Sequence, residues 1–417
     1  MLVYVLNKNG KPLMPCKHQK ARKLLKNGKA KVIKREPFTI QFLYGSSGYR
    51  QHITLGVDAG SKHIGLSATT SKKELFTGEV KLRTDIVDLL STRRQFRRSR
   101  RNRRTRYRES RFLNRSKNKG WLAPSIENKI QCHLSIVAKL HKILPIYKVV
   151  AETASFDIHK IKNPNIHGKE YQEGEQLDFC NVREYVLFRD EHKCQCCKGK
   201  SKDKVLNVHH IESRKTGGNA PNNLITLCET CHKGYHNGTV KLPKTIKRGM
   251  SFRDSSFMGI MRWSFYNKLK ELYSNVSMTF GYITKNTRIE AGLPKEHYVD
   301  ARCISGNALA KPLGICYFIQ KVRRNNRQIH KVKILKGGIR KNNQAPFVVK
   351  GFRLFDRVLY NNKQYYIFGR RSSGAFDIRT LNGEKVNKGS INCKYLRLIN
   401  FRKTWLIERR SVVSSND

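Results

Sequence analysis

The sequence predicts a multidomain α/β protein. Segments typical of buried strands alternate with amphipathic helical segments on both sides of a stretch rich in cysteine and histidine, at 194–236. Hydrophobic residues make up 38% of the 417 residues, which is enough for packed cores in a chain of this length. Basic residues are spread along the whole chain and concentrate at 93–115. These observations predict two to four domains with a charged exterior.

The charge balance restricts the class of partner. Lysine and arginine number 85 against 30 aspartate and glutamate residues, a formal net charge of +55. Because such a charge repels itself, a polyanion is expected nearby; nucleic acid is the first choice and a membrane surface the alternative. No apolar run reaches the length of a transmembrane helix, and the apolar start at 1–6 is too short for a signal peptide. We therefore expect a soluble, cytoplasmic protein without membrane attachment.

The amino-terminal half supplies an α+β unit and two candidate acids. Asp58 follows a buried strand and precedes a tight hairpin, and Glu152 closes another apolar strand. For both, a turn or a surface terminus is the ordinary interpretation and catalysis the alternative. The expected elements are strands at 3–6, 31–34, 38–44, 53–57, 64–68 and 146–151, helices at 17–26 and 126–140, the latter capped by Ser125 and ended before Pro145, and turns at Gly10 and Gly28.

The segment 93–115 carries twelve arginines and a single acid, Glu109, without glycine or proline. We interpret it as a long helix with arginine on nearly every face. A solvated face or a disordered tail is the ordinary origin of a charge run. Arginine, however, makes bidentate contacts with phosphate and stacks on bases, so nucleic-acid contact is expected here. The residues are Arg93, Arg94, Arg97, Arg98, Arg100, Arg101, Arg103, Arg104, Arg106, Arg108, Arg111 and Arg115.

The carboxy-terminal half contains further elements. We expect an amphipathic helix at 252–273, a strand at 277–283 and a helix at 294–304. The last of these places His297 and Asp300 on one face, one turn apart. From about residue 335, short strands alternate with turns, which predicts a small antiparallel sheet or barrel, either for duplex contact or as a structural cap.

Two Cys-x-x-Cys pairs predict a tetrahedral structural zinc site. Its ligands are Cys194, Cys197, Cys228 and Cys231, with Cys196 as a less favoured alternative to Cys197. Between and after the pairs stand His209-His210, Asn223, His232 and His236, which a zinc knot alone does not need. One histidine of the pair can act as general base and the others can hold a divalent ion, while Asn223 positions the base or touches the metal. A zinc finger that binds without cutting is the alternative.

A second candidate centre draws on distant segments. Asp58, Glu152 and Asp300, with His297, offer the oxygen-rich ligand set that two Mg²⁺ ions require in two-metal nucleases. Sequence distance gives no geometry, so the convergence of these residues is a hypothesis.

The order of these motifs resembles that of a known family. The chain contains Gly56-Val-Asp58-Ala-Gly60, the arginine-rich helix, Val150-Ala-Glu152, the Cys/His unit and His297-Tyr-Val-Asp300 in the order of a RuvC-like nuclease split in three by an HNH insertion. The segment Gly10-Lys-Pro-Leu-Met-Pro15 resembles the so-called PLMP domain. Nearly the whole chain thus resembles the IscB family, transposon-associated RNA-guided DNA endonucleases (OMEGA nucleases) regarded as ancestral to the CRISPR type II effector nucleases.

The resemblance implies a fold and a domain order. The split nuclease would be RNase H-like, and the HNH unit a ββα-metal finger. The implied domains are PLMP (1–52), RuvC-like segment I (53–84), an Arg-rich bridge helix (85–118), RuvC-like segment II (119–164), the HNH nuclease with its zinc site (165–248), RuvC-like segment III (249–334) and a β-rich, barrel-like carboxy-terminal domain that reads a target-adjacent motif (335–417).

The resemblance also implies roles for the site residues. Asp58, Glu152, His297 and Asp300 would form the RuvC site, which cuts the non-target strand. His210 would be the HNH base, which cuts the target strand, with His209 as a metal ligand and Asn223 as the family's central Asn. His232 and His236 match the final His region, and which of them binds metal is left open.

Its implied partners are a structured guide (omega) RNA and double-stranded target DNA with a short target-adjacent motif. Mg²⁺ would serve both nuclease sites and Zn²⁺ would be structural. The protein would be a monomer within a ribonucleoprotein of the prokaryotic cytoplasm, associated with the nucleoid when on DNA. The competing hypotheses are a guide-independent HNH homing or restriction-type endonuclease and a non-catalytic RNA-binding protein.

Overall fold

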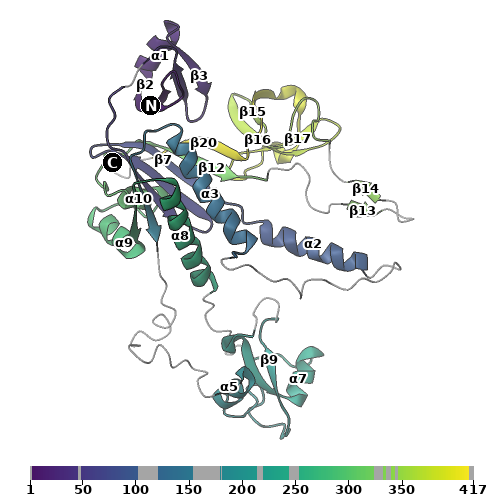
Figure 1. Cartoon of the computed structure of the whole chain (residues 1–417). Helices are drawn as coiled ribbons and strands as arrows, with labels where there is room; N and C mark the ends of the chain where they lie inside the picture. The colour runs from purple at the N-terminus through teal and green to yellow at the C-terminus, as the bar shows by residue number, and fades with distance from the viewer. Residues whose placement is uncertain are drawn as a thin grey trace. The chain divides into compact units, whose positions relative to one another are not determined.

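The computed structural model describes residues 2–45, 48–101, 121–153, 179, 181–213, 219–243, 253–323, 332–334, 340–342 and 346–412. The chain divides into two compact units, shown in Figure 1. The first unit comprises 1–154 together with 258–417, and the second comprises 155–257. The second unit is thus an insertion in the first. Among the described helices, none has the length and apolar character needed to cross a membrane.

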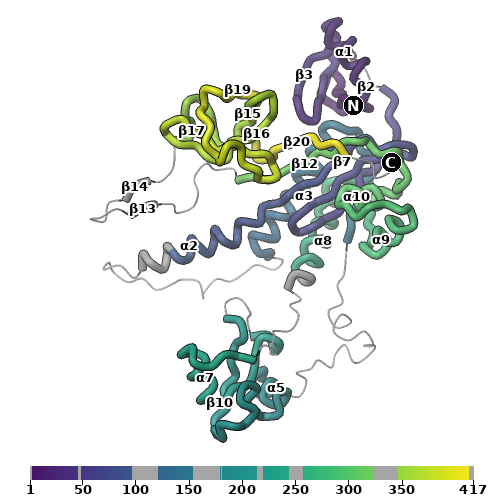
Figure 2. Tube along the Cα trace, turned by 180° about the vertical axis from the view of Figure 1, so that it is seen from behind, coloured from purple at the N-terminus to yellow at the C-terminus, as the bar shows by residue number. Residues whose placement is uncertain are grey.

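A mixed sheet forms the centre of the first unit (Figures 1 and 2). Its middle strands β5, β6 and β7 are consecutive and antiparallel. On one side β8 adds parallel to β5, and β11 adds parallel to β8. On the other side β12 adds parallel to β7, and β20 antiparallel to β12. Across the sheet the strands are β11 (Val276–Phe280), β8 (Lys148–Thr153), β5 (Thr54–Ala59), β6 (His63–Thr69), β7 (Glu74–Lys81), β12 (Ile315–Lys321) and β20 (Trp405–Ser411).

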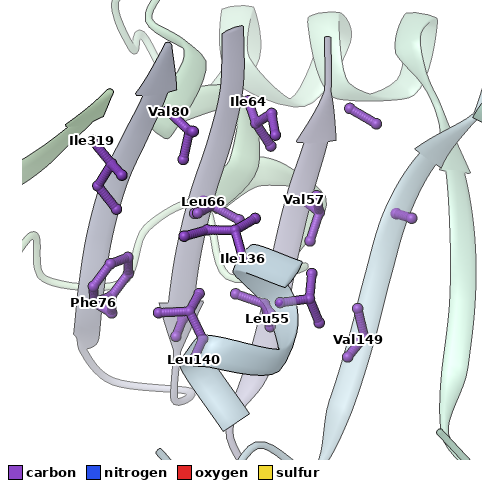
Figure 3. Packing of buried hydrophobic residues seen from close by; sticks show 14 of the residues in the cluster. Leu55, Val57, Ile64, Leu66, Phe76, Val80, Ile136, Leu140, Val149 and Ile319 are labelled. Carbon is purple, nitrogen blue, oxygen red and sulfur yellow. The ribbon is translucent and has the colours of Figure 1, made fainter. Parts of the chain in front are cut away.

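One face of this sheet is apolar and carries the main core. Because side chains alternate along a strand, Leu55 and Val57 of β5 point to the same face as Ile64 and Leu66 of β6. Helices α3 (Pro124–His141) and α8 (Arg253–Leu272) contribute to this core, and Figure 3 shows Ile136 of α3 among the strand residues. The alternate strand positions, which include Asp58, therefore lie on the opposite face.

The opposite face is covered by helix α10 (His297–Ile304), which packs on β5 and β6. Helix α9 (Gly281–Glu290) packs on α10 and follows β11 directly. The sequence prediction of a strand over 277–283 was wrong at its end, because β11 stops at Phe280 and residue 281 begins a helix. The predicted cap at Ser125 was also wrong: Ala123 is the N-cap of α3 and Pro124 takes the first helical position, where its missing N–H costs no hydrogen bond.

The amino-terminal residues form a small α+β body with its own core. Helix α1 (His18–Lys26) ends at Gly28, whose φ of +64° closes the helix as Gly28 N–H donates to Leu25 and Lys29 N–H donates to Leu24. The strands, in order across their sheet, are β2 (Pro12–Lys17), β1 (Leu2–Leu6), β4 (Thr39–Phe42) and β3 (Ala30–Lys34).

An antiparallel sheet forms the carboxy-terminal part, as the turn pattern predicted. Asn361 and Asn362 both have positive φ and make a two-residue hairpin between β15 and β16. The strand at 405–411 does not belong to this sheet: it is β20 of the central sheet, a correction to the prediction that all strands after 335 form one unit. The elements are β18 (Ile391–Asn392), β17 (Ala375–Arg379), β16 (Lys363–Arg370), β15 (Arg357–Tyr360) and β19 (Arg397–Asn400) across the sheet, the short helices η4 (Asn387–Gly389) and η5 (Cys393–Tyr395), and the separate pair β13 (Val332–Ile334) and β14 (Arg340–Asn342).

The second unit is built on an antiparallel strand pair, with Leu224 opposite His210. Its strands and helices are α5 (Val182–Arg189), β9 (Leu206–His210), η2 (Pro221–Asn223), β10 (Leu224–Cys228) and α7 (Glu229–His236). The buried Asp190 after α5 accepts hydrogen bonds from Arg189 and from the backbone of Thr226, which ties α5 to β10.

Candidate active sites

Two glycines determine how closely α10 approaches the sheet. A Cβ on Gly56 would lie 1.9 Å from the Ala301 carbonyl oxygen, and a Cβ on Gly65 would lie 1.8 Å from that of His297. Any side chain at either position would displace the helix. Glycine in these two neighbouring strands therefore allows the first turn of α10 to lie directly over Asp58.

The first candidate site follows from this contact. The imidazole of His297 lies 2.7 Å, Nδ1 to Oδ2, from the carboxylate of Asp58, a residue 239 positions earlier in the chain. This hydrogen bond raises the pKa of His297, although burial opposes the rise. Glu152 lies on β8, the parallel neighbour of β5, and Asp300 lies one turn after His297. The structure thus brings together the four residues that the sequence grouped as a hypothesis.

The carboxylates of this site repel one another. Burial raises the pKa of Glu152, Arg262 lowers it, and the charges of Asp58 and Asp300 raise it further. Burial likewise raises the pKa of Asp300, with Asp58 the next contributor. Clustered, partly buried carboxylates are the oxygen donors that Mg²⁺ prefers, so the residues present fit that ion.

Two arginines that sequence analysis missed compensate this negative charge. Arg262 of α8 lies 3.0 Å from a Glu152 oxygen and donates to the Ala59 carbonyl at 2.9 Å. Arg288 of α9 lies 2.9 Å from Asp300. Arg262 belongs to a helix whose amphipathic pattern predicted packing alone, and Arg288 to a helix that the sequence did not predict.

A histidine and a glutamate that were not predicted lie beside His297. His63 of β6 lies 2.7 Å from Glu79 of β7, and its ring stacks on that of His297 with the centroids 5.2 Å apart. Donor atoms of His63, Glu79 and His297 all lie within 4.8 Å of one another. The available signal was Glu79, an acid between Gly78 and Val80 within a mostly buried strand.

In the second unit, the four predicted cysteines converge. The thiols of Cys194, Cys197, Cys228 and Cys231 lie within 4.8 Å of one another, and Cys197 and Cys228 are 3.7 Å apart. Sulfurs bound tetrahedrally at about 2.3 Å from zinc would be about 3.8 Å apart, so the cluster fits a structural zinc ion. Cys196 is not in the cluster, and its sulfur instead faces the Lys241 carbonyl.

Three histidines form a second donor cluster in this unit. Donor nitrogens of His209, His232 and His236 lie within 4.8 Å of one another, with 3.3 Å between the Nε2 atoms of His232 and His236. Burial and the neighbouring imidazoles lower the pKa of His209 to about 4. Among the described residues, its buried Nε2 has no hydrogen-bond partner. A neutral imidazole with an unused buried nitrogen fits a divalent metal ion.

His210 and Asn223 occupy different positions from this cluster. His210 follows His209 on β9, so its ring leaves the opposite side of the strand, where Nε2 lies 3.0 Å from Asn219 Oδ1. Asn223 is fully buried: its Oδ1 accepts from the Glu212 N–H at 2.9 Å and its Nδ2 donates to the Glu212 carbonyl at 3.0 Å. Asn223 therefore fixes the backbone that follows the histidine pair, and the donor cluster forms without it.

Helix α2 (Ile86–Arg101) carries the beginning of the arginine-rich segment. Arg93 is half-buried and Arg94 is exposed. The other predicted nucleic-acid contacts are not described by the structure: the side chains of Arg97, Arg98, Arg100 and Arg101, and the whole of the residues from Arg103 to Arg115.

Two families match parts of this chain. Residues 194–238 match the family described as HNH endonuclease. This confirms the HNH unit that the family resemblance implied for the Cys/His segment. The chain is a nuclease. Residues 3–174 match the family described as RRXRR protein, and that pattern occurs here as Arg97-Arg-Ser-Arg-Arg101 and again as Arg100-Arg-Asn-Arg-Arg104.

Solved structures of Streptococcus thermophilus Cas9 also resemble the chain. The complexes with the AGGA, GGAA and AGAA PAM are 14%, 14% and 12% identical, with TM-scores of 0.31, 0.32 and 0.33. The matches cover 45%, 53% and 62% of this chain but 26%, 31% and 32% of the Cas9 chain. Similarity at this level does not establish a shared fold. No curated protein matches the chain.

Proposed function

We propose that this nuclease is an RNA-guided DNA endonuclease of the IscB type, with a RuvC-like centre in the first unit and an HNH centre in the second. The observation that carries the proposal is the 2.7 Å contact between His297 and Asp58. Asp58 precedes the HNH insertion in the chain and His297 follows it. The insertion therefore interrupts a second candidate centre, which is separate from the one within the HNH unit. A guide-independent HNH enzyme has no need of that second centre.

The strand arrangement supports the RuvC-like assignment. Three antiparallel strands followed by two parallel ones, in the order β7-β6-β5-β8-β11, give the mixed sheet expected of an RNase H-like nuclease. Asp58 and Glu152 stand on its two adjacent central strands. Residues 1–52 would then be the PLMP domain, α2 the start of the bridge helix, and the carboxy-terminal sheet the part that reads a target-adjacent motif.

At the HNH centre, His210 would take the proton from the attacking water. Oxygen attack on phosphorus breaks the bond to the 3′-oxygen, which leaves with a proton from solvent. His209, His232 and His236 would hold the divalent ion, which stabilises charge on the scissile phosphate and the leaving oxygen when bound. Asn223 keeps the strand end that carries His210 in place through both hydrogen bonds to Glu212.

At the RuvC-like centre, Asp58, Glu152 and Asp300 would hold Mg²⁺, which supplies Lewis-acid stabilisation of the phosphate when bound. His297 is oriented by Asp58 through Nδ1, so its Nε2 is directed away from that carboxylate and can accept the proton of a water. Arg262 and Arg288 limit the repulsion among the acids until the ion binds.

Guide RNA is proposed because of the charge. A chain of +55 with an arginine-rich segment between two parts of one fold matches a protein that keeps a large RNA bound. Guide pairing would read sequence, while the protein reads backbone shape and a short flanking motif.

The test is to purify the protein expressed from its native locus and to sequence the RNA that accompanies it. The proposal predicts one structured RNA with a variable end, and cleavage of DNA complementary to that end. Random RNA fragments, together with sequence-specific cutting by RNA-free protein, would favour a guide-independent HNH enzyme. A single bound RNA without cleavage of any guided substrate would favour a non-catalytic RNA-binding protein.

A further inference from the structure

A pocket opens in the first unit where the end of β3 meets the carboxy-terminal sheet and the start of β20. We call it the junction pocket. Its walls combine basic and aromatic side chains from three distant parts of the sequence, among them Lys34, Arg357, Phe401, Lys403 and Trp405. None of these residues belongs to either nuclease centre.

The junction pocket borders a cluster of lysines around one indole ring. The ammonium groups of Lys321 and Lys139 lie 4.2 and 5.7 Å from the ring centroid of Trp405. Burial lowers the pKa of Lys34 to about 8, with Lys403 and Lys139 as the next contributors. Burial, then Lys321, also lowers the pKa of Lys139. The positive charges of Lys403 and Lys321 thus act on Lys34 and Lys139, so the lysines of this cluster repel one another.

The cluster has little counter-charge on the protein. Glu36 lines the pocket and raises the pKa of Lys34, but less than burial, Lys403 and Lys139 each lower it. The nearby carboxylate of Glu36 lies 2.5 Å from Arg357 and is engaged there. Within the residues that the structure describes, neither Lys34 nor Lys403 pairs with a carboxylate. Lys34 is partly buried, whereas Lys403 is exposed. Burying a charged ammonium opposes folding, so an anion bound here would remove the cost of holding the Lys34 charge in the folded chain.

The pocket also offers an aromatic surface. Of the aromatic side chains that line it, Phe401 is 53% exposed, whereas Trp405 is buried. The guanidinium of Arg353 lies 4.9 Å from the Phe401 centroid. An exposed ring beside basic groups is the arrangement on which bases of single strands stack while phosphates bind the cations.

We propose that the junction pocket binds a single-stranded segment of RNA, with phosphate on Lys34 and Lys403 and a base on Phe401. The inference rests on the proposed function for its choice of RNA over DNA. A guide RNA is a resident partner, which can compensate the lysine cluster throughout the life of the protein, whereas target DNA is bound only in passing.

The experiment compares the full chain, freed of RNA, with the double variant Lys34→Gln/Lys403→Gln. Lys363→Gln/Lys385→Gln is the matched control, since both of its lysines are exposed and neither lines the pocket. Binding of fluorescent polyuridine RNA and of polythymidine DNA of equal length is measured over a salt series. We expect the pocket variant to bind the RNA about tenfold more weakly, with a salt slope smaller by about 1.4, because each neutralised phosphate of a single strand contributes about 0.7.

The melting temperature separates a ligand site from a structural one. The RNA-free pocket variant should melt at or above the wild-type temperature, because the partly buried charge of Lys34 is gone, while stabilisation by added RNA should shrink. Phe401→Leu should weaken RNA binding by about tenfold without a change in salt slope. Equal losses in the control variant, a lower melting temperature of the RNA-free pocket variant, or equal losses for DNA and RNA would overturn the inference. Guided DNA cleavage by the wild-type protein is measured in a separate assay. That assay tests the proposed function, whatever the outcome at the junction pocket.

Discussion

The two candidate centres are built in opposite ways. The donor clusters of the second unit come from short, contiguous sequence, with His232 and His236 one turn apart on α7 and two cysteines at its start. The centre of the first unit joins Asp58 to His297, 239 residues away, and depends on a complete sheet with a helix laid across it. Spacing in the sequence is enough to predict a local site, whereas the convergence of a distributed site can be established only from the fold.

The difference extends to what stabilises each centre. In the second unit, the buried residues around Cys194, Ile225 and Leu227 form a small core that includes the cysteines of the candidate zinc site. If these cysteines hold zinc, we expect the ion to stabilise that core. In the first unit, a continuous apolar core lies beneath the site, and glycines at the helix contact set the geometry. Metal removal should therefore unfold the second unit and leave the first unit folded. A methyl group added at one of the contact glycines should instead disturb the first unit and leave the second unchanged.

The largest effect is expected from removing a zinc ligand. Cys228→Ser should release zinc and unfold the second unit, because structural zinc contributes on the order of 10 kcal/mol to the folding of small zinc domains. Hydrogen exchange should show lost protection in β9 and β10 with the central sheet unchanged. Cys196→Ser, whose sulfur lies outside the cluster, is the control. Retained zinc in Cys228→Ser would contradict the assignment.

The next effect is expected from Gly65→Ala. Its Cβ would lie 1.8 Å from the His297 carbonyl oxygen, so α10 must move away from β6. The free energy of unfolding of the first unit should fall by about 3 kcal/mol, and cleavage by the RuvC-like centre should be lost. Chemical denaturation measures the free energy of unfolding, and an assay with differently labelled strands measures cleavage by the RuvC-like centre. Gly45→Ala, with open space around its Cβ, should change neither.

A smaller effect is expected from Asn223→Ala, because it leaves the Glu212 N–H and carbonyl without their buried partner. The loss should be about 1–3 kcal/mol of stability in the second unit, together with slower cleavage by the HNH centre. Asn223→Asp keeps the oxygen acceptor and should lie between Ala and wild type. If Asn223→Ala abolished metal binding with unchanged stability, the residue would be a ligand and not a positioning residue.

The smallest effect concerns pH. With its pKa lowered to about 8 in the folded chain, charged Lys34 opposes folding below that pH. The penalty disappears as pH rises from about 8 toward the unfolded value of about 10.4. The RNA-free wild type should therefore gain stability over this range relative to Lys34→Gln, measured by denaturant titration at each pH. Parallel pH profiles of the two proteins would show that Lys34 carries no such penalty.

How much the sequence could predict follows the same division between local and distributed features. The four-cysteine cluster, the histidine cluster and the strands flanking Asp58 could be predicted because each depends on residues that lie close together in the sequence. Arg262 and Arg288 were not predicted, since only the packing of α8 and α9 gives them their acidic partners. The pair His63–Glu79 was not predicted either, since it depends on the register of β6 against β7. Strand β20 was misassigned because its pairing with β12 is a long-range choice that local turn chemistry does not encode.

The central claim, two separate nuclease centres in one guided enzyme, is tested most directly by strand-resolved cleavage with Asp58→Ala and His210→Ala. Each variant is purified with its RNA and given a duplex with differently labelled strands. We expect Asp58→Ala still to nick the strand complementary to the guide, and His210→Ala still to nick the opposite strand. If either folded, RNA-bound variant cut neither strand, the division of labour between the two centres would be refuted.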